Sequence, residues 1–397
     1  MLPMIEKKLV QNKENCCGCG TCALVCPTKA ISMEPEELGS LYPKIDSSMC
    51  IQCHACEGVC AFAQERPDPI GEQSVYAAMA KDKDLLKQSA SGGVFAAVAH
   101  GILNDGGIVY GCSLEQVNGE LTPMHIGIES CNELEKLQGS KYVQSTLGTV
   151  FLEIKQHLLR GRLVLFSGTP CQVDALRHYL NNTNTENLYT MDLICHGVPS
   201  ADLFCGYLMV LKKRYGELRN FQFRDKKYGW GYVSKIVTNR RHIVLPSGVS
   251  SYTTYFLESE LSRECCYSCR YANTNRVGDI TIGDYWGIEQ EHPELLGKNS
   301  GELNLQDGVS VVFVNNTHGR MLWERYGKGI HARTSEVPKV KRWNRQLRGP
   351  SSCSATRREL IKLYEKFGYV GIEDCFRRKL GLRYFSRILR FKLRNWR

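Results

Sequence analysis

The sequence predicts a small α+β module, followed by an α/β domain with a largely parallel sheet and a smaller α+β portion. Three observations support this prediction. Nine of the nineteen cysteines lie within the first sixty residues. A polar stretch at residues 64–71, which contains two prolines, then separates this cysteine-rich region from the rest of the chain. From Val75 onward, strand and helix patterns alternate, which is typical of a parallel sheet with crossover helices.

The cysteine-rich region contains two runs with the same spacing, Cys-x2-Cys-x2-Cys-x3-Cys. This spacing is typical of bacterial ferredoxins, in which three close thiolates bind one cluster and the fourth binds the other. We therefore assign Cys16, Cys19, Cys22 and Cys60 to one [4Fe–4S] cluster, and Cys26, Cys50, Cys53 and Cys56 to a second. Structural zinc sites use pairs of cysteines, and a disulfide framework does not explain the repeated spacing. Residues 1–66 are therefore predicted to be a ferredoxin domain, in which Cys17 is packed rather than bound to iron.

The α/β domain is predicted from four strands and the helices between them. The strands are expected at residues 75–80, 107–112, 162–167 and 188–194. The helices are expected from about 94 to 103, after 130, at 147–159, from 171 to 180 and at 202–215. Beyond residue 216 the segments become shorter and richer in aromatic residues and glycine, which indicates the smaller α+β portion.

Four further cysteines could hold a third cluster. Cys171 and Cys195 each follow a predicted parallel strand, at the sheet edge where α/β proteins bind ligands. Cys266 and Cys269 form a Cys-x2-Cys pair on a later loop, so the four thiols would be sufficient for a [4Fe–4S] cluster. In the alternative interpretation, Cys171 and Cys195 are small buried residues and the Cys-x2-Cys pair is half of a zinc knuckle. The spacing alone leaves both interpretations open.

The start of the chain lacks the apolar segment of a signal peptide, and no window approaches eighteen consecutive apolar residues. Abundant cysteines in such a chain indicate a reducing compartment, where thiols serve as metal ligands. We therefore expect a cytoplasmic protein.

The net charge of +10 is concentrated in the last twenty-two residues. Residues 376–397 contain nine Lys and Arg residues and no acidic residue, so subtracting nine from ten leaves about +1 for residues 1–375. Nucleic-acid binding is therefore not expected. The apolar residues of this tail recur at helical spacing and predict one amphipathic helix, in which Gly381 weakens the helix without ending it. They are Phe376, Leu380, Tyr384, Ile388, Phe391 and Leu393, with Leu389 alongside.

A basic amphipathic helix of this kind predicts peripheral contact with an anionic membrane, at its inner face in a cytoplasmic protein. Two alternatives stay open. The apolar stripe could instead pack on the α/β body, or the tail could dock an acidic partner protein.

Seven segments resemble the family of the beta subunits of coenzyme F-420 hydrogenases and dehydrogenases. They are SGGVF at 91–95, GSKYVQS at 139–145, FSGTPCQ at 166–172, DLICHG at 192–197, FRDK at 223–226, CYSC at 266–269 and GDITIGDYWG at 278–287. The resemblance runs from about residue 75 to about residue 340. It implies an N-terminal-like region at residues 75–160 and a C-terminal-like region at residues 161–345.

The resemblance implies a flavoprotein that binds FAD beside an iron–sulfur cluster, which supports the third cluster. The residues that it implies at the flavin are Ser91, Gly92, Gly93, Ser140, Lys141, Tyr142, Gln144 and Ser145. Chemistry agrees, since a Gly-Gly turn at a helix start offers N–H donors to a phosphate, and a lysine can stabilise an anionic reduced flavin. Without the resemblance, residues 91–93 would be read as a plain helix N-terminus.

Other residues in these segments are weaker candidates. His196 directly follows Cys195 and is a candidate for proton transfer to the flavin or substrate. Arg224, Asp225 and Asp284 lie in matching segments and are expected to frame the site.

We therefore expect an iron–sulfur flavoprotein oxidoreductase that passes electrons between ferredoxin-type clusters and a flavin. The flavin would exchange hydride with coenzyme F-420, a nicotinamide or an organic substrate, because flavins connect one-electron and two-electron chemistry. An electron-transfer partner protein or a soluble ferredoxin is expected at the clusters. The alternative is a non-catalytic electron-carrier subunit that docks a partner enzyme.

Overall fold

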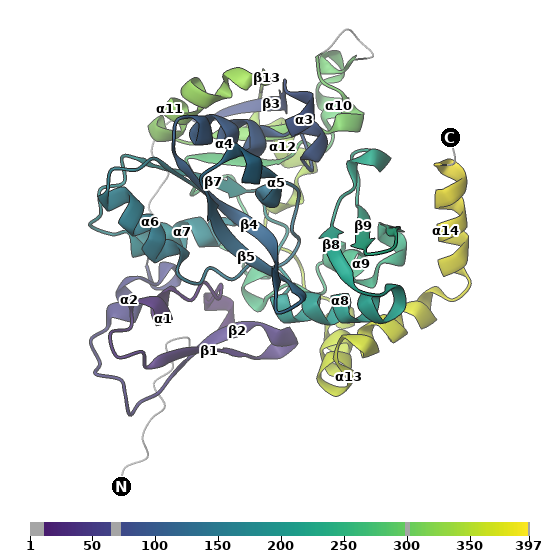
Figure 1. Ribbon diagram of the computed structural model, residues 1–397, viewed down its shortest axis with the longest axis horizontal. Helices are drawn as coiled ribbons and strands as arrows, with labels where there is room; N and C mark the ends of the chain where they lie inside the picture. Colours follow the sequence, from purple (N-terminus) through teal and green to yellow (C-terminus); the bar gives the residue numbers. More distant parts are fainter. Residues whose placement is uncertain (1–11, 65–72, 298–301, 396–397) are drawn as a thin grey trace.

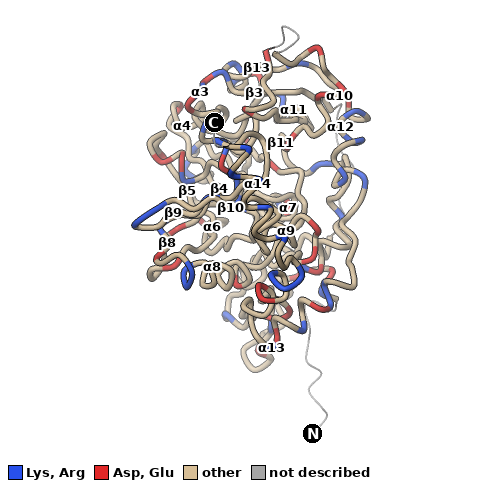
Figure 2. The backbone as a smooth tube through the Cα atoms, turned by 90° about the vertical axis from the view of Figure 1, so that its right-hand side faces the viewer, with Lys and Arg blue, Asp and Glu red and all other residues tan. Residues whose placement is uncertain are grey.

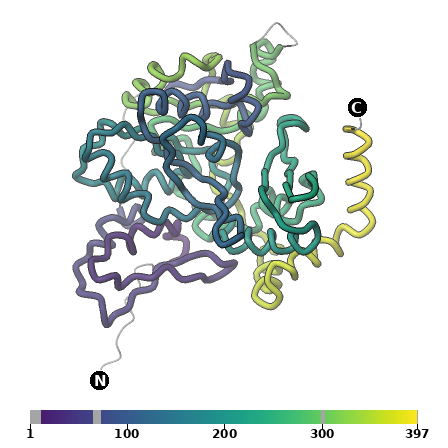
Figure 3. Tube along the Cα trace, viewed as in Figure 1, coloured from purple at the N-terminus to yellow at the C-terminus, as the bar shows by residue number. Residues whose placement is uncertain are grey.

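The computed structural model describes residues 12–64, 73–297 and 302–395. Most of the predicted linker at 64–71 lies outside these ranges, as do the first eleven residues of the predicted ferredoxin domain and the basic Arg397. The ferredoxin region lies against one end of the larger domain, and the C-terminal helix stands on the opposite side of the molecule (Figures 1 and 3).

The ferredoxin region is the α+β module that the sequence predicts. A short helix follows the first cysteines of each run, and an antiparallel β-hairpin lies between the two helices. The elements are α1 (Thr21–Val25), β1 (Ile31–Pro35), β2 (Leu41–Ile45) and α2 (Ala55–Gly58).

The larger domain is built on an eight-stranded sheet, in the order β13-β3-β12-β11-β7-β6-β4-β5 among the described residues. The strands are β3 (Ser74–Ala80), β4 (Ile108–Val117), β5 (Glu120–Ile128), β6 (Val164–Gly168), β7 (Leu188–Leu193), β11 (Ile280–Asp284), β12 (Ser310–Val314) and β13 (Ile330–Ser335). The four central strands β4, β6, β7 and β11 are parallel, whereas β5 on one side and β12, β3 and β13 on the other pair antiparallel. The prediction of a largely parallel sheet therefore holds for the centre of a mixed sheet.

Helices cover both faces of this sheet. Alternate residues of β12 point to opposite faces, so that Val312 and Val314 pack with α4 and α11 while Val311 and Phe313 pack with α12. Farther along the sheet, α6 and α7 cover the same face as α12. The helices are α3 (Lys83–Gln88), α4 (Val94–Asn104), α5 (Leu134–Leu137), α6 (Val150–Leu159), α7 (Pro170–Tyr179), α10 (Ile288–Glu291), α11 (Thr317–Tyr326) and α12 (Val337–Trp343).

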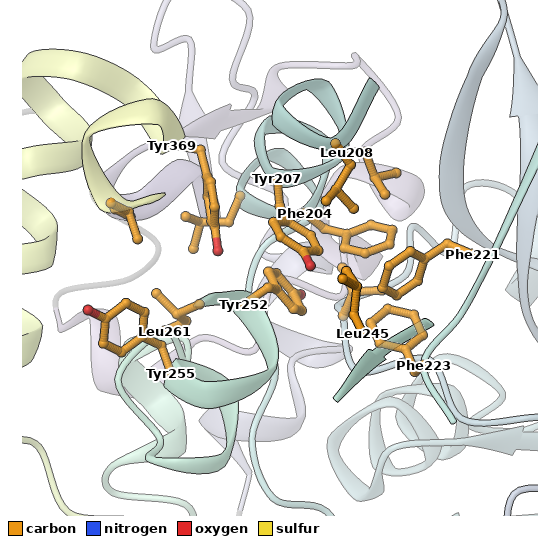
Figure 4. Close-up of a cluster of buried hydrophobic side chains, with 14 of the residues drawn as sticks. Phe204, Tyr207, Leu208, Phe221, Phe223, Leu245, Tyr252, Tyr255, Leu261 and Tyr369 are labelled. Carbon is orange, nitrogen blue, oxygen red and sulfur yellow. The ribbon is translucent and has the colours of Figure 1, made fainter. Parts of the chain in front are cut away.

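A second core belongs to the smaller α+β portion, which holds a three-stranded antiparallel sheet in the order β10-β9-β8. Figure 4 shows its aromatic side chains, in which the ring of Tyr207 stacks on Tyr252 and that of Phe204 stacks on Phe223. The elements are α8 (Ala201–Tyr215), β8 (Leu218–Gln222), β9 (Val233–Thr238), β10 (His242–Pro246), α9 (Ser251–Leu257) and α13 (Ala355–Leu380). The predicted α+β portion is thus present, but β11, β12 and β13 return to the main sheet.

Asp279 fixes the central strand β7 against the start of β11. Its carboxylate accepts hydrogen bonds from the backbone N–H and the hydroxyl of Thr190, at 2.8 and 2.7 Å, and from Arg177 at 3.0 Å. Burial alone would raise its pKa, but His318, Arg177 and Thr190 together lower the pKa to about 2. Asp279 is therefore a permanent anion that fixes the strand leading to Cys195.

The basic tail is not one continuous helix, which corrects the sequence prediction. Gly381 has φ +49° and ends α13, and a separate helix, α14 (Arg383–Arg394), follows. A positive φ is available to glycine at little cost, so this residue turns the chain rather than merely weakening the helix. Phe376 is buried in the second core and belongs to the body. The exposed, basic part of the tail therefore comprises Arg378 and Lys379 at the end of α13 together with α14, which faces the viewer in Figure 2.

Candidate functional site

A cavity of about 320 Å³, here called the large cavity, lies at the carboxyl ends of the central parallel strands. Its walls include Ser167 and Gly168 at the end of β6, Ile194 after β7 and Asp284 at the end of β11. This is the sheet edge at which α/β proteins bind ligands, and the volume lies in the usual range for small-molecule sites, about 300–1,000 Å³. Seven of the eight residues expected at a flavin line it: Ser91, Gly93, Ser140, Lys141, Tyr142, Gln144 and Ser145.

The N-terminus of α4 opens into the large cavity. Gly93 is its N-cap, with φ +75°, and no side chain caps the helix. The first N–H groups of this eleven-residue helix therefore remain available to an anionic ligand. Gly92 does not line the cavity. It lies between strands, where an added Cβ would come within 2.3 Å of the Ala78 carbonyl, so its role is close packing.

Lys141 brings a positive charge to the cavity wall. Its Nζ donates to the carbonyls of Lys136 and Gln138, at 3.0 and 2.7 Å, near the end of α5. Burial lowers the pKa of Lys141 to about 8, while the Cys112 thiol and Glu115 oppose that shift. Lys141 is thus a cation at neutral pH and gains stability from any anion placed beside it.

Arg224 is a second cation at this wall. Its Nη1 lies 2.7 Å from Asp284 Oδ2, and the other carboxylate oxygen of Asp284 accepts from Trp230 Nε1 at 2.7 Å. The Tyr142 hydroxyl interacts with the guanidinium. Even so, no acceptor is in place for its buried Nη2 in the part of the chain that the structure describes. A buried donor without a partner is costly, so this nitrogen favours a ligand oxygen in the large cavity. Arg224 and Asp284 therefore both line the large cavity.

Aromatic rings form another part of the wall. Tyr142 stacks on Phe256 with ring centroids 4.6 Å apart, and Trp286 stacks on Trp230 at 4.7 Å. Tyr142, Phe256 and Trp286 all line the large cavity, together with Tyr232. Such surfaces suit a flat conjugated ring system. Asp225, in contrast, caps a short turn through Lys227 N–H and does not line the cavity.

His125 lines the large cavity and was missed by the sequence analysis, which placed no strand at residues 120–128. Its Nε2 donates to the Ser167 carbonyl at 3.0 Å, so its Nδ1 accepts from the Ser145 hydroxyl at 2.7 Å. Gln172 donates to the same hydroxyl at 3.2 Å. Burial lowers the pKa of His125 to about 4, so the ring is neutral and fixes Ser145 in one orientation. The Asn118-Gly119 pair, which forms the tight turn between β4 and β5, is the sequence signal that could have located this strand.

His196 also lines the large cavity, but both of its ring nitrogens are used within the protein. Its Nε2 donates to the Leu257 carbonyl at 3.1 Å, and its Nδ1 accepts from Gln346 at 2.5 Å. Burial lowers the pKa of His196, so the ring is uncharged. This geometry favours a residue that fixes the loop after Cys195 over one that transfers protons.

The structure brings together the four cysteines expected at a third cluster. Cys171, Cys195, Cys266 and Cys269, here called the third cysteine set, line a second, smaller cavity next to the large one. Burial raises the pKa of Cys195 and takes that of Cys269 to about 12, with repulsion from the neighbouring thiols adding to both shifts. A bound metal core would supply the positive charge that four thiolates at one place require. Cys171 and Cys195 line both cavities, so the two sites share a wall.

The buried side chain of Arg276 holds the loop that carries Cys266 and Cys269. Arg276 donates to the Tyr271 carbonyl within this loop at 2.8 Å, and to the Leu193 carbonyl at the end of β7 at 2.7 Å. Its guanidinium also lies 3.4 Å from the Asp192 carboxylate. These contacts place the loop directly beside Cys195.

The ferredoxin cysteines assigned to the two clusters differ in how closely the structure brings their thiols together. The inner set, Cys16, Cys19, Cys22 and Cys60, lies close enough for its thiols to influence one another electrostatically. In the outer set, Cys26, Cys50, Cys53 and Cys56, the structure shows such an interaction between Cys53 and Cys56, and Cys53 is exposed. Across residues 12–64, 73–297 and 302–395, no group of three or more His, Cys, Asp or Glu could hold a single metal ion. No disulfide bond joins any of the nineteen cysteines.

Two parts of the chain match models of known protein families. Residues 161–339 match the family model for the C terminus of the coenzyme F420 hydrogenase/dehydrogenase beta subunit, and residues 15–63 match a 4Fe-4S dicluster domain. The chain is 23% identical over 280 residues to the F subunit of the F(420)H(2) dehydrogenase of Methanosarcina mazei, covering 68% of this chain and 75% of that one. It is 24% identical over 204 residues to an uncharacterized protein of Methanocaldococcus jannaschii, covering 45% of this chain and 56% of that one.

Two further similarities concern parts of the molecule. Over 64 residues the chain is 41% identical to an uncharacterized polyferredoxin-like protein of Methanocaldococcus jannaschii, covering 14% of this chain and 37% of that one. A solved chain of the F420-reducing [NiFe] hydrogenase complex from Methanosarcina barkeri, from a study of xenon derivatization, has a TM-score of 0.47 and 15% identity, covering 77% of this chain and 96% of that one. Over residues 161–339 the chain is thus similar to the beta subunits of coenzyme F420 hydrogenases and dehydrogenases, and as a beta-subunit-like, iron–sulfur electron-transfer oxidoreductase it carries a 4Fe-4S dicluster domain ahead of this region.

Proposed function

We propose that this chain binds FAD in the large cavity and a third [4Fe–4S] cluster on the third cysteine set. Electrons would then pass between the two ferredoxin clusters, the third cluster and the flavin. The observation that carries this proposal is the shared wall, because Cys171 and Cys195 line both cavities. A cluster on these thiols would lie next to any ligand of the large cavity.

The residues of the large cavity fit a flavin dinucleotide. The open N-terminus of α4, Lys141 and the unsatisfied Nη2 of Arg224 offer three positive sites for anionic oxygens. The aromatic side chains of Tyr142 and Trp286 offer flat surfaces for ring systems. A bound flavin would connect one-electron transfer with two-electron hydride exchange. The hydride partner that we propose is coenzyme F-420, as in the names of the relatives, with a nicotinamide or an organic substrate as the other candidates.

The alternative is an electron-carrier subunit that docks a partner enzyme and performs no hydride chemistry of its own. The relative named as a subunit of a dehydrogenase favours a partner protein, with which this chain would exchange electrons. The large cavity and its cations favour a flavoprotein. FAD released from the purified chain, together with oxidation of a hydride donor, would distinguish the first function from the second. The free cysteines support our proposal of a reducing, cytoplasmic location.

Helix α14 favours a further, peripheral contact with an anionic membrane. None of the described helices combines the length and apolar character needed to cross a bilayer. However, the apolar residues at 382, 385, 389 and 393 recur every three or four positions along α14 and are 59–87% exposed. Arginines at 383, 390 and 394 lie along the helix beside them, whereas Arg387 contacts the body. A flat anionic surface could meet both rows, with arginines at the headgroups and the apolar side chains below.

Helix α14 does contact the body of the protein, but only along one side. Phe391 lies against Tyr228, with ring centroids 5.1 Å apart, and Arg387 donates to the Gly248 carbonyl at 2.7 Å. The row of Leu382, Phe385 and Leu389 remains exposed, so that packing does not account for it.

Replacing two members of the third cysteine set tests whether this set holds a third cluster. The double change Cys266→Ala and Cys269→Ala should reduce iron by about four per chain, from about twelve in the anaerobically purified protein. The ferredoxin signals in electron paramagnetic resonance should persist, because the inner and outer sets are unchanged. The control Cys205→Ala with Cys353→Ala removes the same number of thiols elsewhere and should retain all the iron. Loss of zinc with unchanged iron would establish the zinc-knuckle interpretation instead.

The pH dependence of FAD affinity tests whether Lys141 lies at the flavin site. Its pKa of about 8 lies below the usual lysine value. The side chain is therefore almost fully protonated at about pH 6.5 and loses its charge as the pH rises through 8. FAD binding should therefore weaken between about pH 7 and pH 9, because the ligand's anionic groups lose their partner. Lys141→Met should weaken FAD binding about tenfold or more at pH 7 and abolish this part of the pH dependence. Isothermal titration of flavin-depleted protein gives both quantities.

The matched control is Lys136→Met, since Lys136 is exposed on α5 and pairs with Glu133. It should leave FAD affinity and its pH dependence unchanged. Equal FAD affinity in wild type and Lys141→Met at every pH would place the flavin elsewhere.

Sedimentation with lipid vesicles tests α14. The full chain should pellet with vesicles rich in phosphatidylserine at low salt, and less at high salt. Replacing Leu382, Phe385 and Leu389 by serine should abolish pelleting without loss of folding, because all three are exposed. Truncation after Cys375 is less informative, since it also removes the buried Phe376. Equal pelleting of wild type and the triple variant would exclude membrane contact through this row.

A further inference from the structure

Arg263 is a large, fully buried side chain at the junction between the ferredoxin region and the larger domain, with 1% of its surface exposed. It precedes Cys266 by three residues, and its carbonyl accepts from the Cys266 N–H at 2.9 Å. Its own N–H donates to the Val198 carbonyl, also at 2.9 Å. The backbone of Arg263 thus belongs to the loop of the third cysteine set.

The side chain of Arg263 extends into the ferredoxin region. Its Nε donates to the Cys16 carbonyl at 2.7 Å, and its Nη2 donates to the Leu41 carbonyl at 2.6 Å. The guanidinium lies over the Tyr42 ring, 4.1 Å from the centroid, and Nη2 is 3.6 Å from Cys16 Sγ. Gly18 makes room for it, since an added Cβ would lie 2.6 Å from Nη1. One side chain therefore connects the inner set with the third cysteine set.

The charge of Arg263 has no protein counter-charge. In the described part of the chain no carboxylate forms an ion pair with it, and the acidic groups that affect its pKa are cysteines and Tyr42. A buried cation without a counter-charge is strongly unfavourable. A [4Fe–4S] cluster held by four thiolates carries negative charge, and this charge increases on reduction. A cluster on the inner set would therefore neutralise Arg263.

The two ferredoxin sets differ in this respect. The outer set lies next to an exposed loop at residues 51–54, which contains Cys53, and Ile51 is 64% exposed. The inner set lies against the larger domain, where the Cys17 thiol interacts with those of Cys19 and Cys171. Gln144, from the wall of the large cavity, also donates to the Cys17 carbonyl at 2.8 Å. The inner set is thus the one that adjoins the third cysteine set.

We propose that Arg263 is a positioning residue that docks the inner ferredoxin cluster against the third cysteine set and raises its reduction potential above that of the outer cluster. The proposal rests on the proposed function, because it assigns the order of the electron carriers. The inner cluster is the one that exchanges single electrons with the larger domain, and the outer cluster is the one that meets an external one-electron protein carrier. The buried guanidinium stabilises the extra negative charge of the reduced inner cluster, whereas water screens the outer one.

The test is a redox titration of the full chain, followed by electron paramagnetic resonance, with iron and FAD measured on the same samples. Arg263→Gln should retain iron but disfavour reduction of one ferredoxin cluster at least tenfold, which is a lowering of about 59 mV for a one-electron couple. Arg263→Lys keeps the charge and should show less than half of this shift. Lys44→Gln removes an exposed charge from the same region and should show none. Cys53→Ala, which alters the outer cluster, identifies the shifted signal as that of the inner cluster.

Each outcome decides the proposal. Unchanged potentials in Arg263→Gln with full iron would overturn it and leave Arg263 a purely structural contact. If Arg263→Gln loses about four iron per chain, Arg263→Lys should still retain them, and loss of iron in both variants would show that charge is not the cause. The titration follows the ferredoxin clusters and needs no flavin chemistry. A chain without FAD would therefore contradict the proposed function while leaving this test intact.

Discussion

The loop at residues 263–276 is the constraint on which the functional arrangement depends. Three arginines of this loop extend in different directions. Arg276 donates to a carbonyl at the end of β7, and Arg263 donates to the Cys16 carbonyl in the ferredoxin region. Arg270 donates to the Ala61 carbonyl, next to Cys60. Cys266 and Cys269 lie between these contacts. The position of the third cysteine set is therefore coupled to the strand that carries Cys195 and to the ferredoxin region.

The position of the large cavity beside the third cysteine set explains how one-electron transfer and hydride exchange could occur in one chain. The central parallel strands end at one edge, and this edge forms the floor of the large cavity. The cations Lys141 and Arg224 line the large cavity, and Cys171 and Cys195 lie between this cavity and the small one. Arg263 continues the series of buried cations to the inner ferredoxin set. Buried positive side chains therefore lie at the large cavity and at the inner ferredoxin set, two of the places at which we propose that negative charge accumulates.

Local patterns in the sequence predicted much of this arrangement. The two cysteine runs, the strands before Cys171 and Cys195, and seven of the residues around the large cavity follow from spacing, turn residues and the family resemblance. The antiparallel strands at the sheet edges did not, because β12 and β13 are short and their pairing with β3 depends on contacts distant in sequence. His125 was missed for a different reason, because the Asn118-Gly119 turn that joins β4 to β5 was not used as a hairpin signal. Gly381 was judged by its helix propensity alone, and only the backbone shows that it ends α13. The role of Arg263 is visible only when two distant segments are in contact.

The central claim is that electrons pass between the ferredoxin clusters and a flavin through the third cysteine set. Reduced ferredoxin protein, mixed anaerobically with the full chain in a stopped-flow instrument, tests this claim most directly, since a protein donor cannot enter the large cavity. The account predicts that FAD is reduced in the wild type. In Cys171→Ala with Cys195→Ala, the ferredoxin clusters should still be reduced while reduction of the flavin slows by orders of magnitude. Equally fast flavin reduction in both proteins would contradict the account.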